Sequence, residues 1–258
     1  MNSGFFGEAR ELRREEESVA SMPELAIDTA TIVLRGKFDP GILSAKELFA
    51  EGLISSSDLS QASQKFSTKD IAIFETETIK VLANRELIQL TSQSSEEFDS
   101  LRDLAVNILR LLEGQSLGVM GINRDVHFSV ETAGAWHAIG DRLVPKDEWA
   151  HTLGSAGLSS LVLQAIREDL YEGFRVITIQ TSSLVPQGIY VGHNDHYTLS
   201  ISDGIPANRD QIVSVAHMAA VPTFENIAVA IKILNGEWNN SMNRALDVIE
   251  HVAQEASA

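Results

Sequence analysis

The strongest periodic pattern in the chain lies at residues 223–253, where apolar side chains recur every three or four positions. The members of this stripe are Phe224, Ile227, Ile231, Leu234, Trp238, Met242, Ala245, Ile249 and Val252. Such spacing is typical of one buried face of an α-helix, and a helix of this length extends for about 45 Å. Because that length exceeds the width of a small domain, we expect part of the stripe to meet a partner chain.

A second amphipathic helix is expected between residues 94 and 114. Its apolar positions follow the same spacing and are Phe98, Leu101, Leu104, Ala105, Ile108, Leu111 and Leu112. Ser94 and Glu97 have the spacing of a capping box, in which each side chain accepts from a backbone N–H of the first turn. Gly114 is placed to end the helix.

Segments rich in β-branched residues and bounded by turn residues predict strands around these helices. They cover residues 30–38, 71–84, 86–93, 116–130, 158–167, 174–182 and 188–201. Glu75 and Glu77 interrupt the apolar face of segment 71–84, which predicts a long strand that leaves the sheet or carries a bulge. Asn84 lies before the next strand, where a tight turn is expected.

The order of these elements indicates an internal repeat, because strands followed by one amphipathic helix occur in each half. Two polar strand segments also correspond, GINRDVHF at 121–128 and GHNDHY at 192–197. Chance similarity is the alternative, because the match is short and requires gaps. We expect an α+β fold, with a mostly antiparallel sheet from two related β-β-β-α halves and a long C-terminal helix. The expected divisions are a charged N-terminal segment at 1–25, a first half at 26–132, a connection at 133–157 and a second half at 158–258.

Composition and charge narrow the functional classes. The 258 residues carry a formal net charge of −16, which repels phosphate backbones, so we expect no nucleic-acid partner and favour a basic protein partner. The chain has no cysteine, which excludes disulfides and thiolate metal ligands and is compatible with a reducing compartment. No signal-peptide pattern opens the chain, and no apolar run reaches the roughly 20 residues of a membrane helix. We expect a cytoplasmic protein without a membrane partner.

An H-x-x-H pair, His193 and His196, has a spacing that suits a zinc site when both residues lie on one helical face. The flanking residues GIYV and YTLSI predict a strand instead, in which positions three apart point to opposite faces. His193 and Asp195 would then share a face. A polar strand face is the favoured interpretation, and we expect no metal and no cofactor.

A composite site of two Asp/His pairs is the alternative that carries catalysis. Asp125 and His127 have the same two-residue spacing as His193 and Asp195, so each pair presents both groups on one strand face. If the two strands are neighbours, four groups suited to acid–base chemistry or to metal binding converge, as in a hydrolase with or without a metal. The competing interpretation is two solvent-facing strand surfaces.

A recognition surface is a further hypothesis, because the segment WHAIGDRLVPKDEWAH at 136–151 concentrates aromatic and charged residues. A well-packed connection between the halves has the same composition. The candidate binding residues are Trp136, His137, Asp141, Arg142, Trp149 and Trp238.

A family resemblance rests on the order of four segments, TIVLRGKF, GVMGINRDVHF, GHNDHYTL and NIAVAIKILNGEWNNSMNRALDVI. This order resembles that of SecB-like export chaperones, in which antiparallel strands precede a long helix. It is also similar to a sporadically distributed prokaryotic family of similar length whose function is uncharacterised. The resemblance covers nearly the whole chain by order of elements and brings no catalytic residues with it. We therefore expect a non-catalytic protein-interaction or chaperone-like protein, homo-oligomeric, that acts through a sheet face, an edge strand or the terminal helix; the alternative is the hydrolase.

Overall fold

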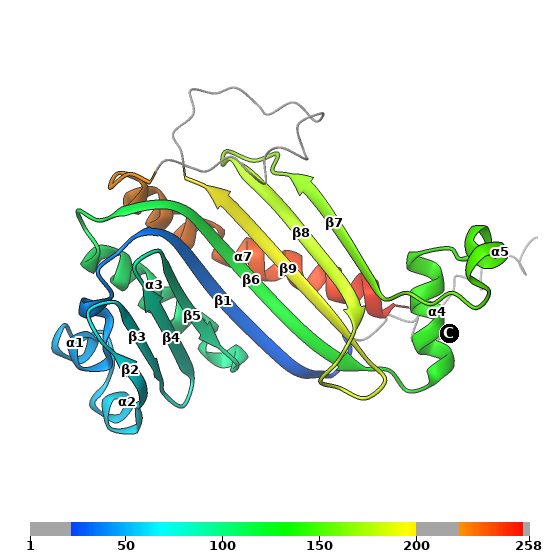
Figure 1. Cartoon of the computed structure of the whole chain (residues 1–258), viewed down its shortest axis with the longest axis horizontal. Helices are drawn as coiled ribbons and strands as arrows, with labels where there is room; N and C mark the ends of the chain where they lie inside the picture. The colour runs from blue at the N-terminus through cyan, green and yellow to red at the C-terminus, as the bar shows by residue number, and fades with distance from the viewer. Residues whose placement is uncertain (1–21, 200–221, 255–258) are drawn as a thin grey trace, which may run out of the picture.

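A nine-stranded antiparallel sheet forms the centre of the computed structural model, which describes residues 22–199 and 222–254 (Figure 1). The strand order is β2-β3-β4-β5-β1-β6-β9-β8-β7. The strands are β1 (Leu25–Lys37), β2 (Ser63–Ser67), β3 (Ile71–Glu75), β4 (Ile79–Asn84), β5 (Leu87–Ser92), β6 (Ser116–Ser129), β7 (Ser160–Ile166), β8 (Gly173–Thr181) and β9 (Gly188–Thr198). The expected α+β class, with a mostly antiparallel sheet and a long C-terminal helix, is confirmed.

The two longest strands, β1 and β6, pair at the middle of the sheet, and the other strands are arranged symmetrically about them. β5 lies on the outer side of β1, and β9 lies on the outer side of β6. Both central strands lead into short helices, and a strand meander and one long helix follow in each half. This is the arrangement that a duplicated unit would give, with β2 as an additional strand in the first half.

The single long strand expected over residues 71–84 is wrong, because this segment forms the hairpin of β3 and β4. Thr76 closes the turn: its backbone N–H donates to the carbonyl oxygen of Ile79 over 2.8 Å, and its hydroxyl accepts from the N–H of Ile79 over 3.1 Å. The predicted turn after Asn84 is confirmed, since the Asn84 side-chain oxygen accepts from two backbone N–H groups, those of Glu86 and Leu87.

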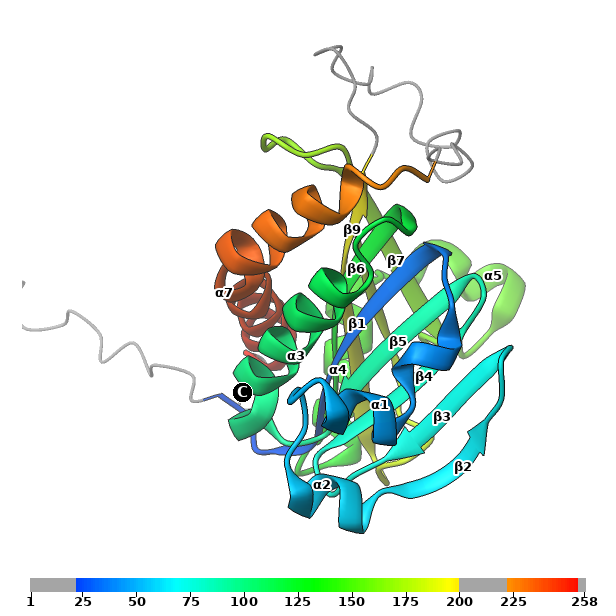
Figure 2. The same ribbon diagram turned by 90° about the vertical axis from the view of Figure 1, so that its left-hand side faces the viewer.

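The chain also forms six described helices, of which α3 and α7 cover one face of the sheet. They are α1 (Ala45–Ala50), α2 (Ser56–Gln61), α3 (Phe98–Leu111), α4 (Ala133–Leu143), α5 (Ala150–Leu153) and α7 (Asn226–Ala253), with 3-10 turns η1 (Pro40–Leu43), η2 (Ser95–Glu97) and η3 (Asp147–Trp149). Figure 2 shows α3 and α7 side by side on this face. The predicted capping box is wrong, because η2 precedes α3 and neither Ser94 nor Glu97 makes a side-chain capping bond.

The apolar stripe of α7 is used within the chain. Seven of its nine members are buried, namely Ile227, Leu234, Trp238, Met242, Ala245, Ile249 and Val252. They pack against α3 and against the strand residues of the same sheet face, in two core clusters. The helix therefore presents little apolar surface to a partner chain, contrary to the sequence-based expectation. Trp238 lies in the core at 2 % exposure, so its prediction as a binding residue is wrong.

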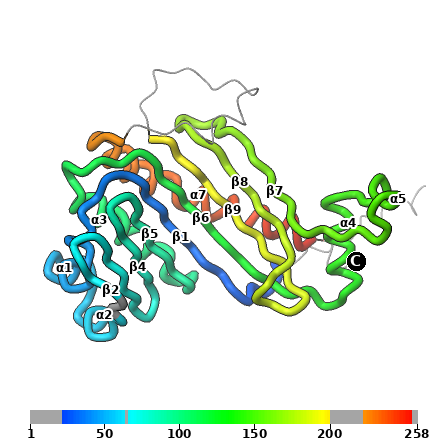
Figure 3. The backbone as a smooth tube through the Cα atoms, viewed as in Figure 1, coloured from blue at the N-terminus to red at the C-terminus, as the bar shows by residue number. Residues whose placement is uncertain are grey.

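The opposite face of the sheet is turned toward the viewer in Figures 1 and 3, and no described helix packs on it. We call this side the open face. Its side chains alternate with the core residues along each strand and are mostly part-buried, as Val33, Asn123 and Asn194 illustrate.

Candidate functional site

The H-x-x-H pair is divided between the two faces of the sheet. In the pairing of β6 with β9, His193 lies opposite Arg124 and His196 lies opposite Gly121. His193 is buried on the helix-covered side, whereas His196 lies on the open face, where its ring stacks on Phe174 with centroids 4.1 Å apart. The two histidines therefore do not share an ion, as the strand geometry predicted, and His193 does share its face with Asp195.

The composite site of four residues does not form. β6 and β9 are neighbours, as the hypothesis required, but Asp125 lies opposite Gly192 and not opposite His193. The register is offset by one residue, so Asp125 and His127 face the open side while His193 and Asp195 face the helices. Within the described residues, no group of three or more His, Cys, Asp or Glu side chains is arranged to hold a metal ion.

Asp195 is the centre of a buried ion-pair network. Its carboxylate is fully buried and accepts from Arg167 Nη1 (2.8 Å), from Arg175 Nε (3.0 Å) and from Arg244 Nη2 (2.7 Å). Asp169 accepts from both Arg167 and Arg175. The network therefore links β9, β8, the residues after β7 and α7, and the interpretation of this strand face as solvent-exposed is wrong.

The charges of this network set the pKa of Asp195. Burial alone would raise that pKa, but the Ser241 hydroxyl, the Arg244 guanidinium and the neighbouring charges of His193 and Arg167 lower it to about 2. Burial also lowers the pKa of His193, and the nearby arginines lower it further, against the attraction of Asp195. A carboxylate held ionised by three arginines forms a structural link between the sheet and α7.

The other pair, Asp125 and His127, forms a hydrogen-bonded group on the open face. The hydroxyl of Tyr190 donates to Asp125, whose pKa is raised mainly by burial. His127 Nδ1 lies 2.8 Å from the Ser182 hydroxyl. That hydroxyl also accepts from two backbone N–H groups, those of Leu184 (3.1 Å) and Val185 (2.9 Å). These two backbone contacts fix Ser182 in the turn that closes the β8–β9 loop.

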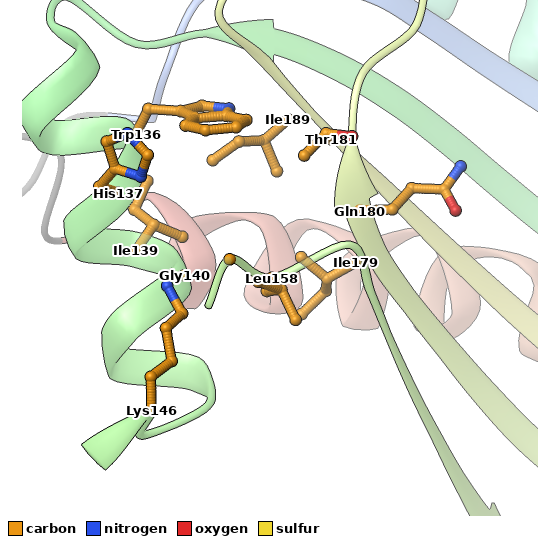
Figure 4. A pocket seen from close by; sticks show the side chains of 11 residues that line it. Trp136, His137, Ile139, Gly140, Lys146, Leu158, Ile179, Gln180, Thr181 and Ile189 are labelled. Atoms are coloured by element: carbon orange, nitrogen blue, oxygen red, sulfur yellow. The ribbon is translucent and has the colours of Figure 1, made fainter. Parts of the chain in front are cut away.

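A small apolar pocket lies between α4 and the ends of β8 and β9 (Figure 4). Its cavity volume is about 50 Å³, and its apolar walls are Trp136, Ile139, Leu158, Ile179 and Ile189. The indole N–H of Trp136 donates to the carbonyl oxygen of Gly188 over 3.3 Å, which fixes the ring at the pocket wall. The pocket has room for an apolar side chain.

The remaining candidate binding residues have separate environments around this pocket. His137 lines it, and Asp141 forms an ion pair with Lys146, which also lines it. Arg142 Nη2 donates to the carbonyl oxygens of His251 (2.9 Å) and Val252 (3.2 Å), so it caps the end of α7. Trp149 is 54 % exposed and lies at the surface of the segment between α4 and α5.

Strand β7 forms one edge of the sheet, and no described strand pairs with its outer side. We call this outer side the β7 edge. Val162 and Leu163 are 60 % and 51 % exposed there, and the sequence carries no ionisable residue between His151 and Arg167. Long, uncharged apolar edge strands are uncommon in soluble proteins, because they offer unpaired backbone groups to other chains. The opposite edge, β2, is shorter and has a register irregularity between Gln64 and Phe66.

The β7 edge is the feature that sequence reasoning missed. Segment 158–167 was predicted as a strand, and its lack of charge is visible in the sequence. An uncharged strand is equally typical of the middle of a sheet, however, so only the strand order identifies it as an edge.

Comparison with known proteins does not assign the chain to a family. No model of a known protein family matches the chain, and no curated protein matches it. Among the described residues, none of the helices combines the length and the apolar character that a membrane span requires. The likeness to SecB-like chaperones stays a prediction.

Proposed function

We propose that this protein is a non-catalytic protein-binding protein that adds an extended segment of a partner to its sheet at the β7 edge. The observation that carries the proposal is that edge itself: outward-facing backbone groups that no described strand pairs, flanked by exposed, uncharged side chains. In strand addition, main-chain hydrogen bonds supply affinity and pockets for alternate side chains supply specificity.

The pocket beside α4 supports the same proposal. Leu158, which lines it, is two residues before the start of β7. A partner strand that runs along β7 therefore ends near an apolar cavity of the size of one side chain. Exposed apolar residues of the same region, Trp149 and Leu153, extend the surface. Exposed apolar side chains beside an unpaired edge are typical of a protein-binding site.

The chemistry of the partner follows from the charges of the chain. Its net charge of −16 favours encounter with a basic protein, while the uncharged edge favours an apolar strand in the contact itself. The proposed partner segment is therefore an extended apolar stretch flanked by basic residues. The proposal places the protein in the cytoplasm, in agreement with a chain that lacks cysteine. The hydrolase alternative has less support, because its two Asp/His pairs lie on opposite faces of the sheet.

The test uses a synthetic peptide of alternating valine and threonine with lysine at both ends, labelled for fluorescence anisotropy. Gln164→Pro removes an outward-facing N–H of β7 and adds a ring on the outer side, and edge strands accept proline where the N–H faces solvent. The matched control is Ser67→Pro, the same change on the β2 edge. We expect wild type and Ser67→Pro to bind the peptide and Gln164→Pro to bind it about tenfold more weakly or worse. Equal binding by all three proteins would contradict the proposal.

A further inference from the structure

The hydrogen-bond pattern of β7 determines which of its backbone groups face outward. The N–H of Arg167 donates to the carbonyl oxygen of Gly173 over 3.1 Å, next to the opposed pair Ile166 and Phe174. In an antiparallel ladder, hydrogen-bonded pairs alternate with pairs that are not bonded. Residues 161, 163 and 165 therefore bond to β8, whereas Ser160, Val162, Gln164 and Ile166 direct their N–H and C=O groups away from the sheet.

This outward pattern is self-complementary. A second β7 strand, laid antiparallel so that Val162 faces Gln164, also places Ser160 opposite Ile166, and every outward group then meets another outward group. The same register is unchanged by a two-fold rotation, which is the symmetry of most homodimers. On the helix-covered side, Leu163 meets Leu163 of the second copy at the axis, where half-exposed apolar side chains gain cover.

The absence of charge favours the β7 edge for pairing between two copies of an acidic chain. A net charge of −16 opposes association of two copies, and directly opposed like charges across a strand pair destabilise it. The segment from Thr152 to Ile166 contains no ionisable residue, so pairing along it opposes no charges. The β2 edge lacks this suitability, because it is short and irregular in register, which are features that prevent edge pairing.

Exposed apolar side chains also lie at both ends of β7, where the two copies would meet. Leu170, in the turn after β7, is 96 % exposed, and Leu153 and Trp149, before β7, are 63 % and 54 % exposed. In the antiparallel register the turn after one β7 lies toward the segment before the other β7. One two-fold axis thus brings Leu170 of each copy toward the α5 end of the other, and three exposed apolar side chains gain a common explanation.

Resting on the proposed function, we propose that the resident occupant of the β7 edge is β7 of a second copy of this chain, paired antiparallel about a two-fold axis. The two sheets then form one continuous sheet, and the edge is covered until a partner segment displaces the second copy. Self-association thereby regulates access to the site. Because the contact is apolar and the copies repel, the dimer tightens as salt rises, whereas binding of the lysine-flanked peptide weakens.

A cysteine cross-link tests the register directly, because the chain has no cysteine of its own. Leu163→Cys places one thiol from each copy at the axis, in a non-hydrogen-bonded pair whose Cα atoms are about 4.5 Å apart, within the range of a disulfide. Mild oxidation of full-length Leu163→Cys is expected to give a covalent dimer, while the matched control Ser67→Cys on the β2 edge stays largely monomeric. Equal cross-linking of the two variants, or none in either, overturns the proposal.

Sedimentation equilibrium of the wild type separates this inference from the proposed function. We expect a concentration-dependent mass that rises to twice that of one chain, and Leu163→Lys is expected to remain monomeric because two ammonium groups would meet at the axis. A monomeric wild type that still binds the synthetic peptide through β7 overturns the self-pairing alone. A β7-linked dimer supports it, and if the wild type, diluted until it is monomeric, then fails to bind the peptide, only the proposed function is lost.

Discussion

Asp195→Asn perturbs the buried network at its centre. The substitution keeps the shape of the side chain but removes the negative charge that three guanidinium groups contact, those of Arg167, Arg175 and Arg244. Arg167 and Arg175 keep Asp169 as a partner. Among the described residues, Arg244 keeps only Glu237 as an ion-pair partner, with its Nη2 3.9 Å from the Glu237 carboxylate oxygen, so its positive charge loses most of its compensation.

The size of the effect follows from the pKa of Asp195. The gap between the ordinary pKa of 3.8 and the folded pKa of about 2 corresponds to roughly 2–3 kcal/mol of stability at neutral pH. Removing one partner of a buried ion pair typically costs roughly 3–5 kcal/mol, because the remaining charge stays buried. Since two of the three arginines keep another carboxylate, we expect a loss of about 3 kcal/mol for Asp195→Asn.

The pH dependence has a defined sign. Folding lowers the pKa of Asp195, so its stabilisation is complete above about pH 4 and is lost as the pH falls toward 2. The free energy of unfolding, measured in urea, should therefore differ between wild type and variant by a constant amount at neutral pH, and the difference should narrow in acid.

The matched control is Asp99→Asn, which removes an exposed carboxylate paired with Arg102 three residues along α3. Its expected cost is below about 0.5 kcal/mol. A cost for Asp195→Asn no larger than for Asp99→Asn, or a difference from wild type that does not change in acid, would refute the structural role of the network.

Three further predictions concern the fold, and each is read from urea unfolding. Trp238→Ala should cost roughly 3–5 kcal/mol because the side chain is in the core, whereas Trp149→Ala, at the surface, should stay within about 0.5 kcal/mol; similar costs would contradict the burial described. Gly236→Ala should stabilise α7 by about 1 kcal/mol since its Cβ meets nothing, while Gly173→Ala should destabilise because its Cβ would lie 2.0 Å from the His196 carbonyl oxygen and its φ is +134°; the opposite order would exclude this packing. Partial burial and the charges of nearby arginines lower the pKa of His196 to about 4, so stability should decrease as the pH falls from about 6.5 to 4, and His196→Gln should flatten that decrease; an unchanged pH profile would count against a neutral, part-buried His196.

Periodic patterns made most of the fold predictable. The stripe of α7 and the residues of α3 repeat every three or four positions, and both helices occur where the spacing placed them. The order of strands and helices also sufficed for the α+β class. The hairpin of β3 and β4 was missed because Glu75 and Glu77 were read as interruptions of one face, although Glu75 ends β3 and Glu77 lies in the turn that follows it.

The register of the strands and their order in the sheet could not be predicted from the sequence. Both determine which side chains come together at the candidate sites. The two-residue spacing of Asp125 and His127 correctly predicted that they share a face, as do His193 and Asp195. Which face each pair occupies depends on a one-residue offset in the register between β6 and β9. The spacing of residues within one strand contains no information about that register. Likewise, the three arginines around Asp195 come from separate parts of the chain, so no local sequence motif predicts the network.

Amide hydrogen exchange along β7 is the most direct test of strand addition at this edge. In dilute full-length protein, the outward-facing amides of Val162, Gln164 and Ile166 should exchange fast, while those of Leu161 and Leu163, bonded to β8, should already be protected. Saturating synthetic peptide should slow exchange at Val162, Gln164 and Ile166. Unchanged exchange at these three amides in the peptide complex, or protection confined to another part of the sheet, would contradict binding at the β7 edge.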